Sequence, residues 1–389
     1  MEIAIIEVRY PYKMSYLDEW LQAWTLVSKK VRVFNVLKNS EVNDLKKSVS
    51  KFDLIVILHS VTADSNKWLR DMVPVLTKRK CQIILFVGNE YSNPWLSMES
   101  RLQNIADIQP EIVATQLSQE AGEFLYESSG GVIVETPHAL PRRELGENFN
   151  SIRNIDLGFR GFEYPWFILD SDRNSVVKDV SDFYKLQNLN VDTSNHERLN
   201  KEKWYNFLTS CKTTVASEGG SNFVFKTDKV WTEALRFLES SNAGKFLGND
   251  FAGASLLRVL PGNLKKILRD VGKMLGQQQG ATSELSSEIL SGVLSKIHVD
   301  DFKYVSGKAL TSRHMDAIYC GAWQILTPGQ YNGILQPGSH FTLWNSISPE
   351  EAFREVEEAI ALKRNLSIYE ELIGENSYQS RIQNLLARL

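Results

Sequence analysis

Three segments in the second half of the chain contain residue types that bind phosphate groups. The first is SEGGSN (217–222), in which an acidic residue and two glycines follow a short apolar stretch. Glycines let the backbone approach a ligand closely and turn its amides towards an anion, although a plain turn after a strand uses the same residues. Glu218 is therefore a candidate catalytic residue, and Gly219, Gly220 and Ser221 are candidate ligand contacts.

The second segment, TSRHMDAIYCG (311–321), has the pattern of a helix with a capping hydroxyl residue at its start. Amides at a helix N-terminus attract phosphate, and an Arg side chain offers a diphosphate a planar fork of donors. A carboxylate accepts two hydrogen bonds, as the two hydroxyls of a ribose require. Ser312, Arg313 and Asp316 are therefore candidate nucleotide contacts, and Lys308 would add a second positive charge. A capped, solvated helix is the alternative.

The third segment, PGQYNGIL (328–335), also follows an apolar stretch. Its amides would reach a pyrophosphate, although the pair Asn-Gly is equally an ordinary turn. We name Gly329, Tyr331, Asn332 and Gly333 as candidate contacts.

Other candidates for chemistry lie at the expected ends of strands. Asp170 and Asp172 have the spacing of a metal-binding DxD pair, but they precede an amphipathic helix, where Asp serves as a cap, so we expect no metal site. His59 is a candidate contact of an acceptor and Glu90 a candidate general base. A buried structural histidine and a simple turn are the alternatives.

These candidates must be positioned by an alternation of apolar and amphipathic stretches that indicates β-strands and α-helices in turn. Near-continuous Val, Ile and Leu in several strands indicates a parallel sheet covered by helices on both faces. In the first half we expect strands at 3–8, 31–37, 53–60, 81–87, 111–116 and 131–137, and helices near 16–28, 41–50, 64–78, 95–106 and 118–127.

The alternation stops between about 139 and 153, where we place a domain boundary, and then resumes. Two doubly wound halves would leave a ligand crevice between them, at the carboxyl ends of their strands. In the second half we expect strands at 153–161, 188–193, 213–220, 302–307, 323–329 and 341–345, and helices near 173–186, 201–211, between 229 and 296, and at 312–320, 349–363 and 366–389.

Composition excludes several classes of protein. The 389 residues, 43% of them hydrophobic, suffice for two or three domains, and a net charge of −3 provides no cationic field for nucleic acid or an anionic membrane. Three widely spaced cysteines and the lack of an apolar run of about 18 residues indicate a cytoplasmic protein with at most peripheral contact with the inner face of a membrane. No dinucleotide or P-loop fingerprint follows a predicted strand.

The stretch ALTSRHMDAIYCGAWQILTPGQYNGILQPGSHFTLWNSIS (309–348) resembles the C-terminal signature of group 1 glycosyltransferases, particularly the CgeB-like branch. ASEGGSN (216–222) is similar to the glycine-rich loop of that family, and SYQSRIQNLL (377–386) to its closing motif. The resemblance covers about residues 200–389.

This resemblance implies the GT-B fold. An acceptor-binding Rossmann-like domain (1–150) would face a donor-binding one (151–370), and a final helix (371–389) would cross back to the first domain. Asp316 matches the family's ribose-binding residue, Arg313 and the loop 329–333 its diphosphate contacts. Lys308 replaces the first Glu of the common E-x7-E pattern, which leaves the choice between retention and inversion open.

We therefore predict a metal-independent glycosyltransferase that moves a sugar from a nucleotide-sugar donor to a glycan or lipid-linked glycan, in surface polysaccharide biosynthesis, without a further cofactor. A non-catalytic nucleotide- or sugar-binding module of the same fold is the first alternative, because Lys308 replaces a glutamate and no base is evident. A nucleotide-sugar epimerase of the same architecture is the second.

Overall fold

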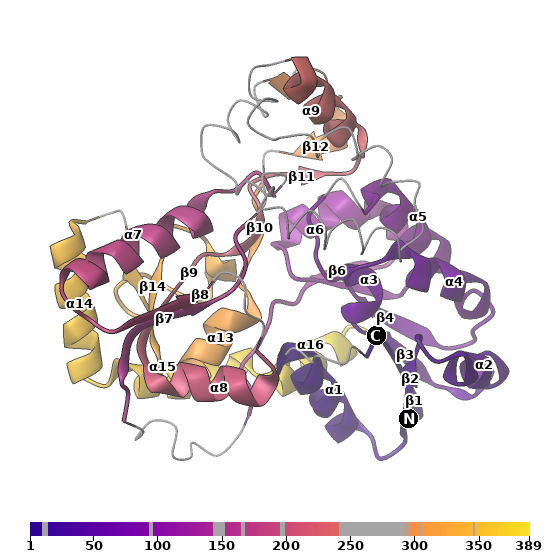
Figure 1. Ribbon diagram of the computed structural model, residues 1–389. Helices are drawn as coiled ribbons and strands as arrows, with labels where there is room; N and C mark the ends of the chain where they lie inside the picture. The colour runs from indigo at the N-terminus through magenta and orange to yellow at the C-terminus, as the bar shows by residue number, and fades with distance from the viewer. Residues whose placement is uncertain are drawn as a thin grey trace.

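The computed structural model describes residues 1–9, 15–92, 96–142, 152–164, 168–194, 199–240, 292–293, 296, 298–303, 305–344 and 347–389. Within them the chain forms two parallel sheets, each flanked by helices and each built from a separate half of the sequence (Figure 1). The expected α/β class with two Rossmann-like halves is confirmed.

The first sheet has six parallel strands in the order β2-β1-β3-β4-β5-β6. Every residue of β1 and β3 is buried, because helices cover both faces of the sheet, and this explains their unbroken apolar sequences. The strands are β1 Ile3–Glu7, β2 Val31–Asn35, β3 Leu54–Ile57, β4 Gln82–Phe86, β5 Ile112–Thr115 and β6 Val132–Glu135. The helices are α1 Ser15–Val27, α2 Asn39–Ser48, α3 Ser60–Ala63, α4 Asn66–Leu76, α5 Met98–Ile108 and α6 Gln119–Tyr126.

The second sheet has five parallel strands in the order β15-β14-β9-β7-β8. Counted within each half, both sheets begin 2-1-3-4-5, so the strand order reverses between the first and third strands, where open α/β sheets bind ligands. The strands are β7 Ile155–Arg160, β8 Val191–Ser194, β9 Cys211–Ala216, β14 Trp323–Leu326 and β15 Thr342–Leu343. The helices are α7 Asp172–Leu186, α8 Lys201–Ser210, α13 Ser312–Tyr319, α14 Pro349–Ala361 and α15 Arg364–Asn376.

Between β9 and α13 the chain leaves the second sheet. It forms β10 (Gly219–Ser221), β11 (Val224–Phe225), α9 (Lys229–Ser240), β12 (Phe302–Lys303) and β13 (Gly307–Ala309). The expected single strand at 302–307 is wrong, because β12 and β13 pair separately with the equally short β11 and β10. α9 confirms the start of the helices expected after 229, and residues 241–291 lie outside the described part of the chain.

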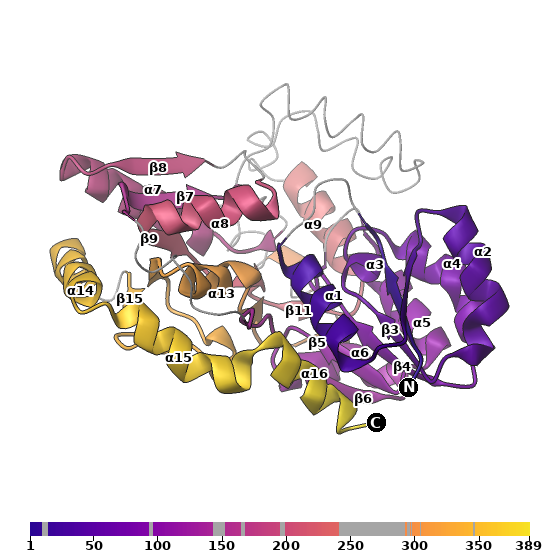
Figure 2. The same cartoon turned by 90° about the horizontal axis from the view of Figure 1, so that it is seen from below.

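The C-terminal segment contains two helices where we expected one at 366–389. Ser377 is extended (φ −81°, ψ 156°) and its hydroxyl accepts the N–H of Ser380 at 3.2 Å, which ends α15 and starts α16 (Tyr378–Leu386). Tyr378, Ile382 and Leu385 pack in one cluster with apolar side chains of β1 and α1, and α16 lies beside α1 in both views (Figure 2). None of the described helices is long and apolar enough to cross a membrane.

Candidate functional site

Two arginines lie close together near the carboxyl end of β7. Arg173 is in the first turn of α7, with its guanidinium carbon 3.9 Å from the ring centroid of Tyr164. Arg313 is in the first turn of α13, 4.8 Å from the ring centroid of Phe159. Among the residues that the structure describes, no carboxylate forms an ion pair with either arginine, and Arg173 Nε and Arg313 Nη1 are buried without a hydrogen bond. We call Arg173 and Arg313 the arginine pair.

The surroundings of the arginine pair favour an anion between the two side chains. Burial, and next the charge of Arg173, lower the pKa of Arg313 below its ordinary value. Gly161 follows β7, and a Cβ atom there would press on the Arg313 guanidinium. Buried cations without partners are costly, and two guanidinium forks match the oxygens of a phosphate group.

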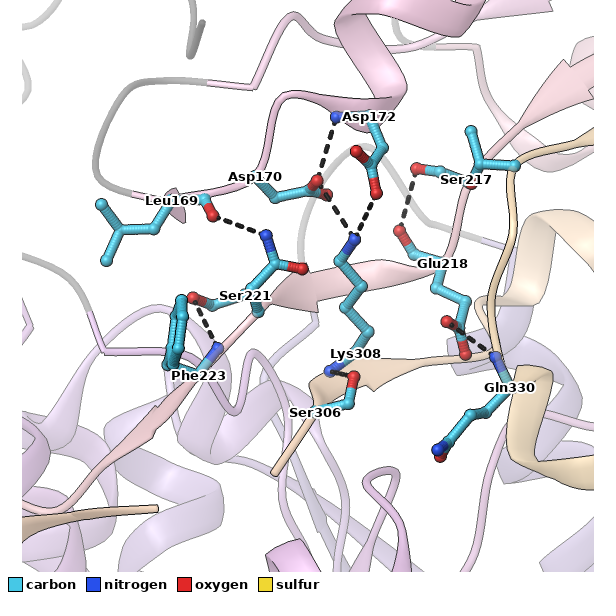
Figure 3. Close-up of polar contacts among 12 residues, drawn as sticks. Leu169, Asp170, Asp172, Ser217, Glu218, Ser221, Phe223, Ser306, Lys308 and Gln330 are labelled. Carbon is cyan, nitrogen blue, oxygen red and sulfur yellow. Dashed lines mark hydrogen bonds and ion pairs between the residues drawn. The ribbon is translucent and has the colours of Figure 1, made fainter. Parts of the chain in front are cut away.

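Lys308 extends from β13 to the start of α7 (Figure 3). Its Nζ atom lies 2.6 Å from Asp172 Oδ2 and 3.1 Å from Asp170 Oδ1, and the N–H of Asp172 donates to Asp170 Oδ1 at 3.0 Å. Asp170 thus binds the first N–H of α7, as expected of a helix cap. Lys308 was predicted to add a positive charge, but its two carboxylate partners leave no excess positive charge there.

Glu218 lies at the carboxyl end of β9 and is buried. Its carboxylate accepts the N–H of Tyr331 at 2.6 Å and that of Gln330 at 3.2 Å. Burial raises the pKa of Glu218, and these two N–H donors counteract the increase. Gly329 packs against this carboxylate so closely that any side chain would clash with it. Two of the amides that we expected to face a pyrophosphate therefore donate to Glu218.

The remainder of this loop connects the two halves of the molecule. Tyr331 and Asn332 both have positive φ angles, 46° and 53°. The Asn332 side-chain amide donates to the backbone oxygen of Gln116 at 3.0 Å and to Glu135 Oε1 at 2.8 Å, both beyond strands of the first sheet or at their ends. Gly333 donates its N–H to Gln330 and closes the turn.

Asp316 lies on the buried side of α13. It accepts hydrogen bonds from Trp204 Nε1 at 2.9 Å and from the Tyr205 hydroxyl at 3.3 Å, both on α8. Ser312, the first residue of α13, is partly exposed, and Thr311 precedes it as the N-cap. The proposed contact of Asp316 with a ribose stays a prediction, and it would require these aromatic donors to move or to share the carboxylate.

The two candidates from the first half of the chain, His59 and Glu90, are buried. Glu90 accepts hydrogen bonds from the Thr115 hydroxyl (2.5 Å), the Gln116 N–H (2.6 Å) and the Tyr126 hydroxyl (2.7 Å), and burial raises its pKa to about 7. The ring of His59 stacks on His138 at a centroid distance of 5.6 Å, and burial lowers its pKa. Their catalytic roles stay predictions.

The structure thus assembles residues that are far apart in the sequence around the start of α7. β10 contains Gly219, Gly220 and Ser221, and Gly220 lies opposite Lys308 of β13. Arg173 and the ion pairs of Asp170 and Asp172 were not predicted. A signal was present, since DSDR (170–173) follows the first strand of the second half and opens a helix, which is where α/β sheets bind anions.

No protein-family model matches the chain, and no curated protein matches it. Among solved structures, it is similar to the crystal structures of Anabaena HepE in complex with UDP, with UDP and glucose, and with UDP-glucose. These are 11%, 10% and 10% identical to it, each with a TM-score of 0.44, and each comparison covers 100% of both chains.

Proposed function

We propose that the protein is a GT-B glycosyltransferase that moves a sugar from a nucleotide-sugar donor to a glycan or lipid-linked glycan in surface polysaccharide biosynthesis. The observation that carries this proposal is the arginine pair at the strand-order reversal of the second sheet, without a carboxylate partner among the described residues. The sequence signatures at 216–222 and 309–348 lie in the same region and support it.

In this proposal the donor diphosphate lies between Arg173 and Arg313. The two charges would bind the ground-state diphosphate and stabilise the additional negative charge that develops when the sugar leaves. The acceptor would enter from the first domain, and the helix α16 would join the donor-binding domain to it as in the GT-B architecture.

The first test is nucleotide binding by the arginine variants. Because hydrogen bonds to charged groups contribute about 1.5–3 kcal/mol, Arg173→Met and Arg313→Met should each weaken binding of the preferred nucleoside diphosphate roughly 10- to 100-fold. Calorimetry with uridine, guanosine, thymidine and cytidine diphosphates measures this. Arg354→Met on the exposed face of α14 is the control for loss of one charge.

The second prediction concerns the stability of the same variants without ligand. Each arginine is a cation without a carboxylate partner among the described residues. Replacing it by an apolar side chain of similar length should leave the melting temperature unchanged or raise it. Weaker nucleotide binding together with a lower melting temperature would indicate a structural role for the arginines instead.

Turnover distinguishes the enzyme from its alternatives. A panel of nucleotide sugars incubated with glycan and lipid-linked acceptors should yield a glycosylated acceptor and free nucleoside diphosphate. Nucleotide binding without turnover would instead indicate a binding module. Conversion of the sugar while it stays attached to the nucleotide would identify an epimerase.

A further inference from the structure

Asp170, Asp172 and Lys308 form a polar cluster at the start of α7, which we call the aspartate–lysine cluster (Figure 3). Arg173 of the arginine pair is the next residue of α7. Exposure falls steeply across it: the side chain of Asp172 is 45% exposed, that of Lys308 is 8% exposed and that of Asp170 is fully buried. Only Asp172, among these three, presents a substantial surface to a ligand.

The aspartate–lysine cluster has carboxylate oxygens that accept no hydrogen bond from any described residue. Asp170 Oδ2 is buried without a partner. Asp172 uses Oδ2 for Lys308, and no described residue donates to its other oxygen, Oδ1. A half-exposed carboxylate oxygen held in place by an ammonium group is a site for a hydroxyl donor.

The aspartate–lysine cluster differs in charge from the arginine pair. Burial lowers the pKa of Lys308, but the carboxylates of Asp170 and Asp172 outweigh burial and leave it above its ordinary value, so the ammonium stays charged. Two carboxylates then face one cation. The arginine pair begins one residue later, at Arg173, and has two cations and no carboxylate partner among the residues that the structure describes. The site is therefore divided into a cationic part and an adjoining part without excess positive charge.

The two parts match the two parts of a sugar nucleotide. Asp172 precedes Arg173, and the charges of both side chains act on the Tyr331 hydroxyl, so both lie near it. The group bonded to a phosphate at the arginine pair would therefore lie close to Asp172. Carboxylate oxygens accept hydrogen bonds from hydroxyl groups and repel another carboxylate.

We propose that the aspartate–lysine cluster binds the transferred sugar through its hydroxyl groups, with Asp172 as the contact, and that it selects a neutral sugar over a uronic acid. Lys308 and Asp170 are positioning residues, because they hold the Asp172 carboxylate and the first turn of α7. This inference rests on the proposed function, since it requires a sugar diphosphate at the arginine pair.

The test compares free nucleotide, neutral sugar nucleotide and uronic acid nucleotide on one set of variants. The probes are UDP, UDP-glucose and UDP-glucuronic acid, or GDP, GDP-mannose and GDP-mannuronic acid, according to the diphosphate that binds. The wild-type chain should bind the neutral sugar nucleotide at least about tenfold more tightly than the uronic acid nucleotide, which is a difference of about 1.4 kcal/mol.

The variant Asp172→Asn should lose about tenfold in affinity for the neutral sugar nucleotide, change less than about twofold for the free diphosphate, and discriminate less against the uronic acid. Asp182→Asn is the matched control, because Asp182 is an exposed aspartate on the same helix whose lysine partner, Lys178, lies 3.7 Å away. It should change none of the three affinities.

The variant Lys308→Met tests whether Lys308 positions the Asp172 carboxylate. It should lower affinity for the neutral sugar nucleotide and leave the free diphosphate little changed, and melting temperatures without ligand identify variants that fail to fold. An equal loss for free and sugar-bound diphosphate in Asp172→Asn, or no loss for either, would overturn the proposal, as would a preference of the wild-type chain for the uronic acid. If no nucleotide binds the wild-type chain, the proposed function itself fails.

Discussion

At the scale of single residues, ionisable side chains of the protein lie in three different environments. Arg173 and Arg313 are cations without carboxylate partners in the described structure, Lys308 is a cation held by two carboxylates, and Glu90 is an acid surrounded by hydrogen-bond donors. Only the first of these environments is costly without a ligand. This is why we assign binding of the anionic donor to the arginines.

Glu90 makes stability depend on pH. Burial raises its pKa from 4.5 to about 7, so the folded protein binds more protons than the unfolded chain between these values, and the free energy of unfolding falls as the pH rises. From pH 4 to pH 8 the wild-type chain should lose roughly 3 kcal/mol relative to Glu90→Gln, which has no titrating group there.

Urea unfolding of both proteins across this pH range measures the difference. Other titrating groups are common to the two proteins and cancel. A constant difference between wild type and Glu90→Gln would show that the Glu90 carboxyl titrates in the folded protein as it does in the unfolded chain.

At the scale of elements, the site depends on where helices begin. α7 and α13 place one arginine each in their first turns, and the carboxyl side chain of Asp170 binds the first N–H of α7. The loop after β14 is held by Glu218, whose carboxylate acts as an internal anion for two of its amides. The geometry of helix starts therefore determines the site more than the sheet itself does.

Ser377 provides a prediction at this scale, because its hydroxyl caps α16 and its side chain is buried. Ser377→Ala should lower the free energy of unfolding by about 1 kcal/mol, the usual cost of losing an N-cap. Thermal denaturation measures the effect. Ser367→Ala, at an exposed position of α15, is the control and should change stability little; equal effects of the two variants would contradict the cap.

At the scale of the whole molecule, the contacts between the two halves include those of α16, of the Asn332 side chain and of the segment after β11. In this segment Asp228 accepts the N–H of Met98 at 2.9 Å, and Glu99 accepts the N–H of Asp228 at 2.9 Å. Each carboxylate thus accepts a backbone N–H from the other half of the sequence. These contacts hold the segment after β11 against the start of α5.

Removing the carboxylates of Asp228 and Glu99 should destabilise the start of α5. Asp228→Ala leaves the buried Met98 N–H without its acceptor, at a cost of about 1–3 kcal/mol, and amide hydrogen exchange at 97–100 and 227–231 should become faster in proportion. In the Asp228→Ala variant, the further change Glu99→Ala should lower the free energy of unfolding by less than it does in the wild-type protein, because both carboxylates hold the same two segments.

Asp107→Ala, on the exposed face of the same helix, is the control for this prediction and should leave exchange at both segments unchanged. Additive effects of Asp228→Ala and Glu99→Ala would show that the two carboxylates act independently.

The sequence by itself determined most of the strands and helices of the two large sheets and the α/β class. Strands buried on both faces need continuous apolar residues, so their periodicity is a local signal, and β1, β3 and β14 confirm it. Glycine-rich loops after strands could also be recognised in the sequence. The break at Ser377 was not predicted, because Ser in the sequence SYQS fits a helix interior and a cap alike.

Only the tertiary structure decided which side chains meet. Asp172 and Lys308 are 136 residues apart, Glu218 and Tyr331 are 113 apart, and both contacts depend on strand order and on the direction of side chains at helix starts. Hydrophobic periodicity determines neither the strand order nor the direction of these side chains. The loop amides and Lys308 therefore have carboxylate partners that no motif indicated, while Arg173 and Arg313 lie together without one in the described part of the chain.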